Sequence, residues 1–284
     1  MTGPVVVGVD GSPAGLKAVW WAAHEAVDRH APLHLLHSWT TQPLVVPAAQ
    51  EADGRREHGR DVLERTAAEL LDHHGDLLEL TTETVSAPAE QALLDRSGDA
   101  GLLVLGSRGH SSVAGFLLGS VTLQVVSLAL CPAVVVRADD PTVETSYGRL
   151  QVADRDEIVV GVPESGPAVD AVLEFAFTTA DANGGLVRAV TAVPPSSPAH
   201  SVEEERTQLA AMLAPWQGKF PDVPVVARVG AGPAGQILLA SCARSRLLIV
   251  GRRPRPTHLV WKLRPVTQAA VRHAACPVAV VPHC

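Results

Sequence analysis

The chain has 284 residues, of which 46% are hydrophobic and 19% are charged, and its formal net charge at pH 7 is −7. This length suits two domains that each bury a full core, and the composition is typical of a globular protein. The negative charge argues against general nucleic-acid binding, and no apolar run approaches the ~20 residues that a membrane helix needs. Because the first predicted strand starts within four residues, we expect no signal peptide. Because the four cysteines show no CxxC spacing, we expect a reduced, cytoplasmic protein.

The first half of the chain alternates predicted strands with predicted helices. A continuous apolar strand runs from Val5 to Val9 and ends at Asp10. Ser12 then fits the N-cap, and Pro13 the first position, of a helix that runs to about residue 29. The later elements are strands at 33–39, 78–85, 102–105 and 133–136, helices at 55–74, 88–96 and 121–130, and a loop at 40–49. This order predicts an α/β fold with a parallel, doubly wound sheet and right-handed crossovers.

The second half of the chain repeats the first. The recurring segments are 5–9 and 158–162, 88–94 and 233–239, 102–106 and 247–251, and 131–136 and 276–281. From Pro88 onward the two copies are separated by a constant 145 residues, which indicates a tandem duplication. We therefore predict two doubly wound parallel-sheet domains, at 1–138 and 156–284, joined by a polar linker at 139–155. Their charges differ: residues 1–140 hold 9 basic and 18 acidic residues, a net charge of −9, whereas residues 155–284 hold 13 basic and 10 acidic residues, a net charge of +3.

The candidate ligand site centres on the segment that follows the strand at 102–105. That strand stops at Gly106, a Gly/Ser-rich loop containing Gly109 follows, and Gly119 and Ser120 precede the next helix. Glycines let the backbone approach a ligand, and the free N–H groups at a helix start attract anions. The arrangement therefore predicts a phosphate site. The alternative is a glycine-punctuated turn before an ordinary helix that Ser120 caps.

The amides of Gly109, Gly119, Ser120 and Val121 are candidates to hold phosphates, and the Ser120 hydroxyl adds one more hydrogen bond. Asp10 ends the first strand at the same edge of the sheet, which is where open α/β sheets bind ligands. Its carboxylate can accept hydrogen bonds from ribose hydroxyls or from an adenine amino group. The alternative for Asp10 is to cap the helix that follows.

Four further positions lie at this edge. Gly8 weakens the first strand unless a ligand or a neighbouring helix must approach it closely. Ser107, Arg108 and Ser111 lie in or beside the glycine loop. Arg108 and Ser111 are candidates for phosphate contacts, with a solvated arginine as the alternative for Arg108.

The duplication provides an internal control for these assignments. Asp10 corresponds to Pro163, Gly109 to Pro254, Gly119 to Arg264 and Ser120 to Pro265, while the apolar strand residues persist. Glycines needed only for turns would have little reason to disappear together with an acidic residue far away in the chain. The joint loss therefore favours a nucleotide site in the first half and a degenerate second half.

Several segments also resemble a known family. They are Gly106-x-x-Gly109 followed after nine residues by Gly119-Ser120, the stretches 5–13 and 20–23, and the stretches 88–94 and 131–136. These segments resemble the ATP-binding branch of the universal stress protein family, and the resemblance covers most of the first half. It implies an adenine-nucleotide α-hydrolase-like fold and a bound ATP with Mg2+. It further implies that the backbone near Ser38 meets the adenine and that Gly106 meets the ribose.

Catalysis has little support in the sequence. There is no nucleophile elbow, no HExxH motif and no Cys/His pair, and His34 and His37, three residues apart on one strand, point to opposite faces and make a poor metal pair. The lack of catalytic motifs favours binding over turnover, and the resemblance implies an ATP-binding stress-response regulator. We expect it to act through ligand-linked conformational or oligomeric change and to be at most a slow ATPase. The alternatives are an ATP-hydrolysing or phosphotransfer enzyme, and a nucleotide-free interaction scaffold.

Six basic residues surround the degenerate loop of the second half: Arg252, Arg253, Arg255, Lys262, Arg264 and Arg272. They indicate either a solvated surface or a site that docks the acidic first half, an acidic partner or a second anion. The expected partners of the chain are an adenine nucleotide and, beyond it, an unidentified protein partner or a second copy of the chain. No nucleic acid and no membrane are expected.

Overall fold

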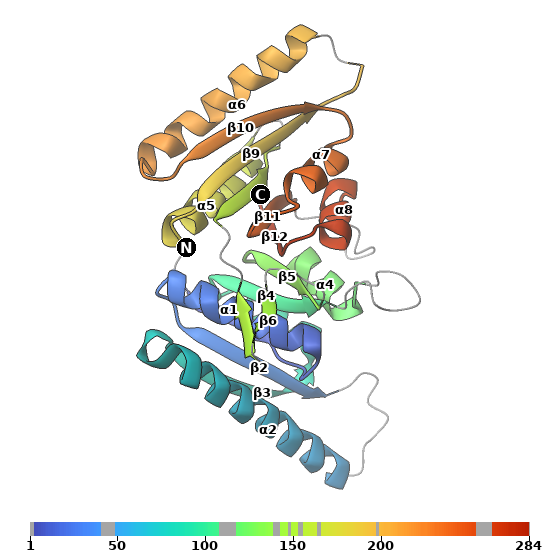
Figure 1. Cartoon of the computed structure of the whole chain (residues 1–284). Coiled ribbons are helices and arrows are strands. Elements are labelled where there is room, and N and C mark those ends of the chain that lie inside the picture. The colour runs from blue at the N-terminus through green and yellow to red at the C-terminus, as the bar shows by residue number, and fades with distance from the viewer. Residues whose placement is uncertain are drawn as a thin grey trace. The chain divides into compact units, whose positions relative to one another are not determined.

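The computed structural model describes residues 3–40, 49–107, 118–138, 143–146, 149–152, 156–163, 166–196, 199–253 and 263–283. The chain divides into two compact units (Figure 1). Unit 1 comprises Met1–Asp139 and Val143–Val152, and unit 2 comprises Asp140–Thr142 and Ala153–Cys284. Within the described ranges no helix combines the length and the apolar character needed to cross a membrane.

Unit 1 is a parallel five-stranded sheet with connecting helices. Its main elements are β1 (Val5–Gly8), α1 (Pro13–Asp28), β2 (Leu33–Thr40), α2 (Ala49–His74), β3 (Leu80–Pro88), α3 (Ala89–Arg96), β4 (Leu102–Ser107), α4 (Ser120–Leu128) and β5 (Ala133–Arg137). The strand order is β3-β2-β1-β4-β5, and every neighbouring pair is parallel. The chain therefore leaves β1 toward β2 on one side and later places β4 on the other side. The strand order reverses between β1 and β4, as the predicted doubly wound sheet requires.

The sequence explains why β1 and β4 lie at the centre of this sheet. Both are continuous apolar runs without the alternation of a half-exposed strand, and Leu102 to Leu105 are each at most 4% exposed. The helix between β1 and β2 begins as predicted, with Pro13 at its first position and the Ser12 hydroxyl as its N-cap. Buried strands and a well-capped first helix thus fix the edge of the sheet at which Asp10 lies.

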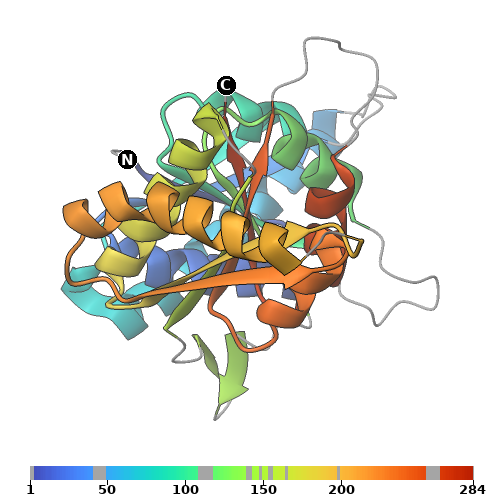
Figure 2. The same ribbon diagram turned by 90° about the horizontal axis from the view of Figure 1, so that it is seen from above.

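Unit 2 has the same architecture. Its elements are β8 (Glu157–Gly161), α5 (Pro167–Ala182), β9 (Leu186–Val193), α6 (Ala199–Lys219), β10 (Val225–Ala231), α7 (Ala234–Ser241), β11 (Leu247–Arg252), α8 (Pro265–His273) and β12 (Val278–Pro282). The strand order β10-β9-β8-β11-β12 matches that of unit 1, and all pairs are parallel. The helix α6 lies alongside β10 (Figure 2). The duplication predicted from the sequence is therefore a duplication of the whole fold.

Several boundaries differ from those predicted. The helix α2 begins at Ala49, and of the expected loop at 40–49, residues 41–48 lie outside the described residues. A single 3-10 turn, Gly75–Leu77, follows α2, so β3 starts at Leu80 instead of residue 78.

The stretch 139–155, expected to be a linker, contains the strands β6 (Val143–Ser146) and β7 (Arg149–Val152). They pair antiparallel as a hairpin that lies against α1 and belongs to unit 1. This hairpin was not predicted, because each of its strands has only four residues and neither is an apolar run.

Candidate functional site

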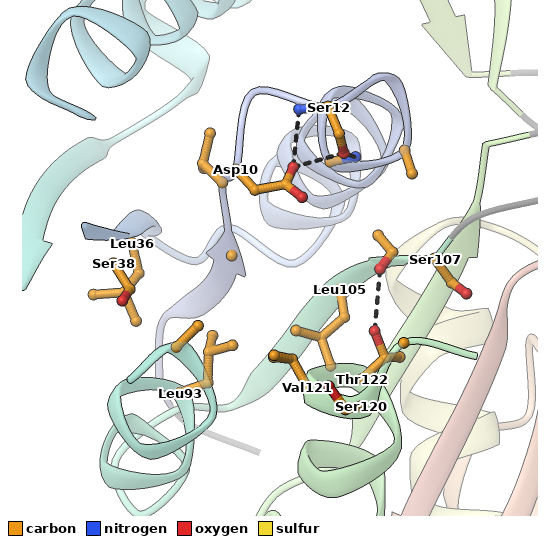
Figure 3. Close-up of a pocket in the computed structure, with 17 residues that line it drawn as sticks. Asp10, Ser12, Leu36, Ser38, Leu93, Leu105, Ser107, Ser120, Val121 and Thr122 are labelled. Atoms are coloured by element: carbon orange, nitrogen blue, oxygen red, sulfur yellow. Dashed lines mark hydrogen bonds between the residues drawn. The ribbon is translucent and has the colours of Figure 1, made fainter. Parts of the chain in front are cut away.

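A cavity of about 520 Å3 opens in unit 1 at the carboxyl ends of β1 and β4, where the strand order reverses (Figure 3). Eight of the eleven predicted site residues line it: Gly8, Asp10, Ser38, Gly106, Ser107, Gly119, Ser120 and Val121. The other three, Arg108, Gly109 and Ser111, lie outside the described residues. Residues that are far apart in the sequence thus meet around one space of a size typical of small-molecule sites.

A local hydrogen-bond network fixes the exposed carboxylate of Asp10. Its Oδ1 accepts hydrogen bonds from the Ser12 amide at 2.9 Å and the Ser12 hydroxyl at 2.6 Å, in the manner of an Asx turn. The Ser12 hydroxyl oxygen in turn accepts the Gly15 amide at 3.1 Å. Ser12, and not Asp10, therefore caps α1. In the described part of the chain Oδ2 of Asp10 accepts no hydrogen bond, so it remains available to a ligand.

The start of α4 lies across the cavity from Asp10 (Figure 3). Gly119 is the N-cap and Ser120 the first helical residue, and no side chain caps the helix. The alternative in which the Ser120 hydroxyl caps this helix therefore does not hold, because Ser120 already lies inside the first turn. The first backbone N–H groups of a helix have no partner inside the helix. At α4 these groups lie at the cavity wall, beside Ser120, Val121 and Thr122.

Two hydroxyls mark the junction between β4 and α4. The Thr122 hydroxyl donates to the Gly106 carbonyl at 3.2 Å, which ties the start of α4 to the end of β4. The Ser107 side chain is 3% exposed, and its hydroxyl has no hydrogen-bond partner within the described ranges. A buried hydroxyl without a partner is unfavourable unless something else pairs with it.

The glycines at this site have different reasons to be glycine. At Gly106 a Cβ would lie 2.6 Å from the backbone carbonyl of Ala14, so the close packing of α1 on β4 already requires glycine there. At Gly8 a Cβ would lie 3.5 Å from Leu93, and at Gly119 it would lie 3.8 Å from Thr122, both ordinary contacts. Among the described residues, neither packing nor backbone conformation requires glycine at positions 8 and 119. Their missing side chains leave room in the cavity.

The apolar side of the cavity was not predicted from the sequence. The lining residues that were not named in advance are Val9, Ser12, Ala14, Gly15, Leu36, Ala89, Leu93, Leu105 and Thr122. Leu36, Leu93 and Leu105 form an apolar wall beside Ser38, whose hydroxyl donates to the Ala87 carbonyl at 2.5 Å. A buried leucine in a strand or helix looks like a core residue, so no pattern of residues distinguishes it from a residue that lines a cavity.

The two histidines of β2 make polar contacts within unit 1. His34 contacts the Glu83 carboxylate at 2.9 Å, and Nδ1 of His37 lies 2.7 Å from the Val9 carbonyl. Glu83 also accepts two hydrogen bonds from Arg96, and these lower the pKa of Glu83 below its ordinary value of 4.5, against the effect of burial. Among the described residues no group of three or more histidine, cysteine or carboxylate side chains is arranged to hold a metal ion.

Comparisons with known proteins agree with this architecture. The sequence profile described as "Universal stress protein family" matches residues 1–137 and again residues 155–282. A universal stress protein of Mycolicibacterium smegmatis is 30% identical over 293 residues, covering 98% of this chain and 96% of that protein. A universal stress protein of Mycobacterium tuberculosis strain H37Rv is 29% identical over 293 residues, covering 97% and 96%.

Among solved structures, the chain is similar to a universal stress protein from Archaeoglobus fulgidus. The TM-score is 0.75 at 17% identity, and the match covers 98% of both chains, which supports the tandem fold. Because the family profile matches each half and the curated relatives match nearly the full length, the chain belongs to the universal stress protein family, with one family domain in each half.

Proposed function

We propose that unit 1 binds ATP or a related adenine nucleotide in its cavity, and that the protein is a cytoplasmic stress-response regulator. In this proposal nucleotide binding changes the conformation or the assembly of the protein. The observation that carries the proposal is the position of Asp10 and the start of α4 on opposite sides of one cavity. In an adenine nucleotide the ribose lies between the base and the phosphate chain. Asp10 offers a partner to the ribose, and the start of α4 offers one to the phosphates.

The phosphates fit the start of α4. There the free amides and the positive end of the helix dipole act together on an anion. No contact with the described residues requires glycine at position 119 or 8, and without side chains these residues let a phosphate chain and a sugar approach the backbone. The Ser107 hydroxyl, which has no partner within the described part of the chain, is a further donor at this end of the cavity.

The nucleoside fits the opposite side. Oδ2 of Asp10 is fixed in place and can accept a ribose hydroxyl, which is a strong type of hydrogen bond because the acceptor is charged. Leu36, Leu93 and Leu105 provide an apolar surface for a purine ring. The cavity of about 520 Å3 lies within the ~300–1,000 Å3 range of small-molecule sites.

Asp10 is the only carboxylate among the described residues that line the cavity. A Mg2+ ion bound with ATP would therefore take most of its ligands from phosphate oxygens and water, as Mg2+ commonly does. Efficient hydrolysis needs a charge-neutralising cation, a metal carboxylate and a positioned water. The described lining supplies no lysine and no second carboxylate, which favours binding over turnover.

The duplicated unit supports a role for Arg108 in phosphate binding. Its counterpart at a shift of 145 residues is Arg253, which lines the equivalent cavity of unit 2. By this correspondence we propose that Arg108 lies near the phosphates.

The test is to denature the purified full-length protein by heat and chromatograph the supernatant for released nucleotide, and then to titrate the protein with ATP. We expect bound ATP in the wild type and none in Gly119→Arg. Arg264→Gly, the reverse exchange in unit 2, is the matched control and should retain it. No nucleotide and no effect of ATP on unfolding would favour the scaffold alternative. Sustained release of phosphate would favour the enzyme.

A further inference from the structure

Unit 2 retains a cavity of about 580 Å3 at the position that corresponds to the site in unit 1. Gly161 ends β8 as Gly8 ends β1, and each pairs with the neighbouring strand of its own unit. The repeat aligns Leu238 with Leu93. Gly8 and Leu93 line the cavity of unit 1, and Gly161 and Leu238 line that of unit 2. The Thr267 hydroxyl donates to the Gly251 carbonyl at 3.2 Å, as the equivalent threonine does in unit 1. The frame of the site has therefore survived the loss of the glycine motif.

The chemistry of this second cavity is different, because its lining has become cationic. Arg264 replaces Gly119, Pro163 replaces Asp10, and Arg253 also lines the space. Both arginines are exposed, and within the described residues neither forms a hydrogen bond or an ion pair. The described lining contains no carboxylate. The exchange has removed one negative charge and added one positive charge at the cavity wall.

The start of α8 adds to this positive character. Arg264 is its N-cap, and Pro265 stands at the first position, where the missing N–H removes one donor. The amides of the next residues, Val266 and Thr267, belong to the first turn and have no partner inside the helix. Two arginine residues and a helix N-terminus line this space, and this combination matches an anion with several oxygen atoms, such as a phosphate group.

The rest of the lining restricts what can carry this anion. Pro163 has no side-chain acceptor for a ribose hydroxyl, which Asp10 provides in unit 1. Thr191, the only hydroxyl residue of the described lining besides Thr267, donates its hydroxyl to Glu205 at 3.2 Å. The remaining wall is mainly apolar, with Val162, Val190, Leu238 and Val250.

We propose that the cavity of unit 2 is a second binding site, which takes a phosphate monoester with a small apolar group and does not take an adenine nucleotide. The phosphate binds between Arg253, Arg264 and the start of α8, and the apolar group packs on the valines and Leu238. This site is independent of the nucleotide site proposed for unit 1, since it uses none of the same residues.

The experiment is a calorimetric titration of the full-length protein with phenyl phosphate, alone and in the presence of excess ATP. We expect saturable binding that persists in excess ATP and that weakens about 10- to 100-fold in Arg264→Gln and in Arg253→Gln, the usual effect of losing a hydrogen bond to a charged group. Inorganic phosphate should bind more weakly than phenyl phosphate, and benzyl alcohol, which has no charge, should not bind.

Two control variants distinguish binding in this cavity from nonspecific attraction to surface charge and from binding in unit 1. Arg206→Gln removes a positive charge on the exposed face of α6 and should leave the binding unchanged. Asp10→Asn alters the site in unit 1 and should also leave it unchanged. Absence of binding, displacement by ATP, equal affinity for inorganic phosphate, or an equal loss in Arg206→Gln would overturn the proposal. A failure of ATP to bind, by contrast, would count only against the function proposed for unit 1.

Discussion

The exchange Gly119→Arg separates the requirements of the fold from those of the ligand. Gly119 has φ −58° and ψ 148°, and Arg264, its counterpart at the N-cap of α8, has φ −62° and ψ 154°. Unit 2 therefore already holds an arginine in this backbone conformation. Among the described residues, a Cβ at position 119 would make only an ordinary contact, 3.8 Å from the Thr122 hydroxyl.

The expected change in the stability of the ligand-free protein is small. Replacing glycine where the conformation suits other residues stabilises a protein by about 0.4–1 kcal/mol, because the unfolded chain loses freedom. Glycine is also a better N-cap than a residue that cannot cap, by roughly 0.5–1 kcal/mol. The two effects oppose each other, so we expect the free energy of unfolding without ligand to stay within about 1 kcal/mol of the wild type.

The effect of ATP should be large by comparison. At an ATP concentration 100 times its Kd, binding stabilises the wild type by about 2.7 kcal/mol. For a unit of this size that corresponds to a rise in Tm of roughly 5–10 °C. In Gly119→Arg the new side chain occupies the place of the phosphates, and we expect no rise.

Thermal unfolding with and without ATP measures both quantities, with Gly119→Ala as the control that adds only a Cβ and should keep part of the shift. If ATP raises the Tm of Gly119→Arg as much as it raises that of the wild type, the start of α4 is not the phosphate site. A fall in the Tm of the ligand-free variant by more than about 4 °C, which corresponds to more than about 1 kcal/mol, would show that the glycine is structural.

Three further predictions concern single side chains of unit 1. Asp10→Asn keeps the oxygen that holds the turn but removes the charge, so calorimetry should show a Kd for ATP about 10- to 100-fold higher, with an unchanged Tm. Arg96 lowers the pKa of Glu83 in the folded protein below 4.5. The pair therefore stabilises the fold fully above pH 4.5, and this stabilisation is lost as the pH falls through the pKa that Glu83 has in the folded protein. Urea unfolding should therefore show a cost of about 1 kcal/mol or less for Glu83→Gln at pH 7 and a smaller cost at pH 3. An equal cost at both pH values would contradict the pairing. Burial and, after it, the charge of His73 lower the pKa of His74 below 6.5 in the folded protein. Protonation of His74 therefore costs stability as the pH falls below 6.5. Thermal unfolding should show that His74→Gln loses less stability than the wild type between pH 7 and pH 5.

The sequence predicted the sheet well, because its signals are local and strong. Continuous apolar runs such as Leu102–Leu105 identify buried parallel strands, and Ser12 with Pro13 identifies the start of α1. The repeat at 145 residues extended this prediction to unit 2. Once strands and helices alternate, the position of the ligand edge follows from topology, which is why Asp10 and Gly106 were predicted at the same edge.

The helix cap, the roles of individual glycines and the second cavity depend on three-dimensional contacts, which produce no periodic pattern in the sequence. The sequence places a hydroxyl near the start of α4, but only the backbone shows that Gly119 takes the cap position. Gly106 and Gly8 look alike in sequence, yet only Gly106 is required by the packing of α1. The cavity of unit 2 was also not predicted, because its motif residues are lost while the frame that encloses the space remains.

The hairpin β6–β7 has a consequence for fragment design. Because it lies against α1 and belongs to unit 1, a fragment that stops where the sequence repeat ends, after β5, would uncover part of α1. Such a fragment would expose surface that the full chain protects, which favours aggregation and cleavage by proteases. A fragment of unit 1 that is meant to fold should continue through Val152.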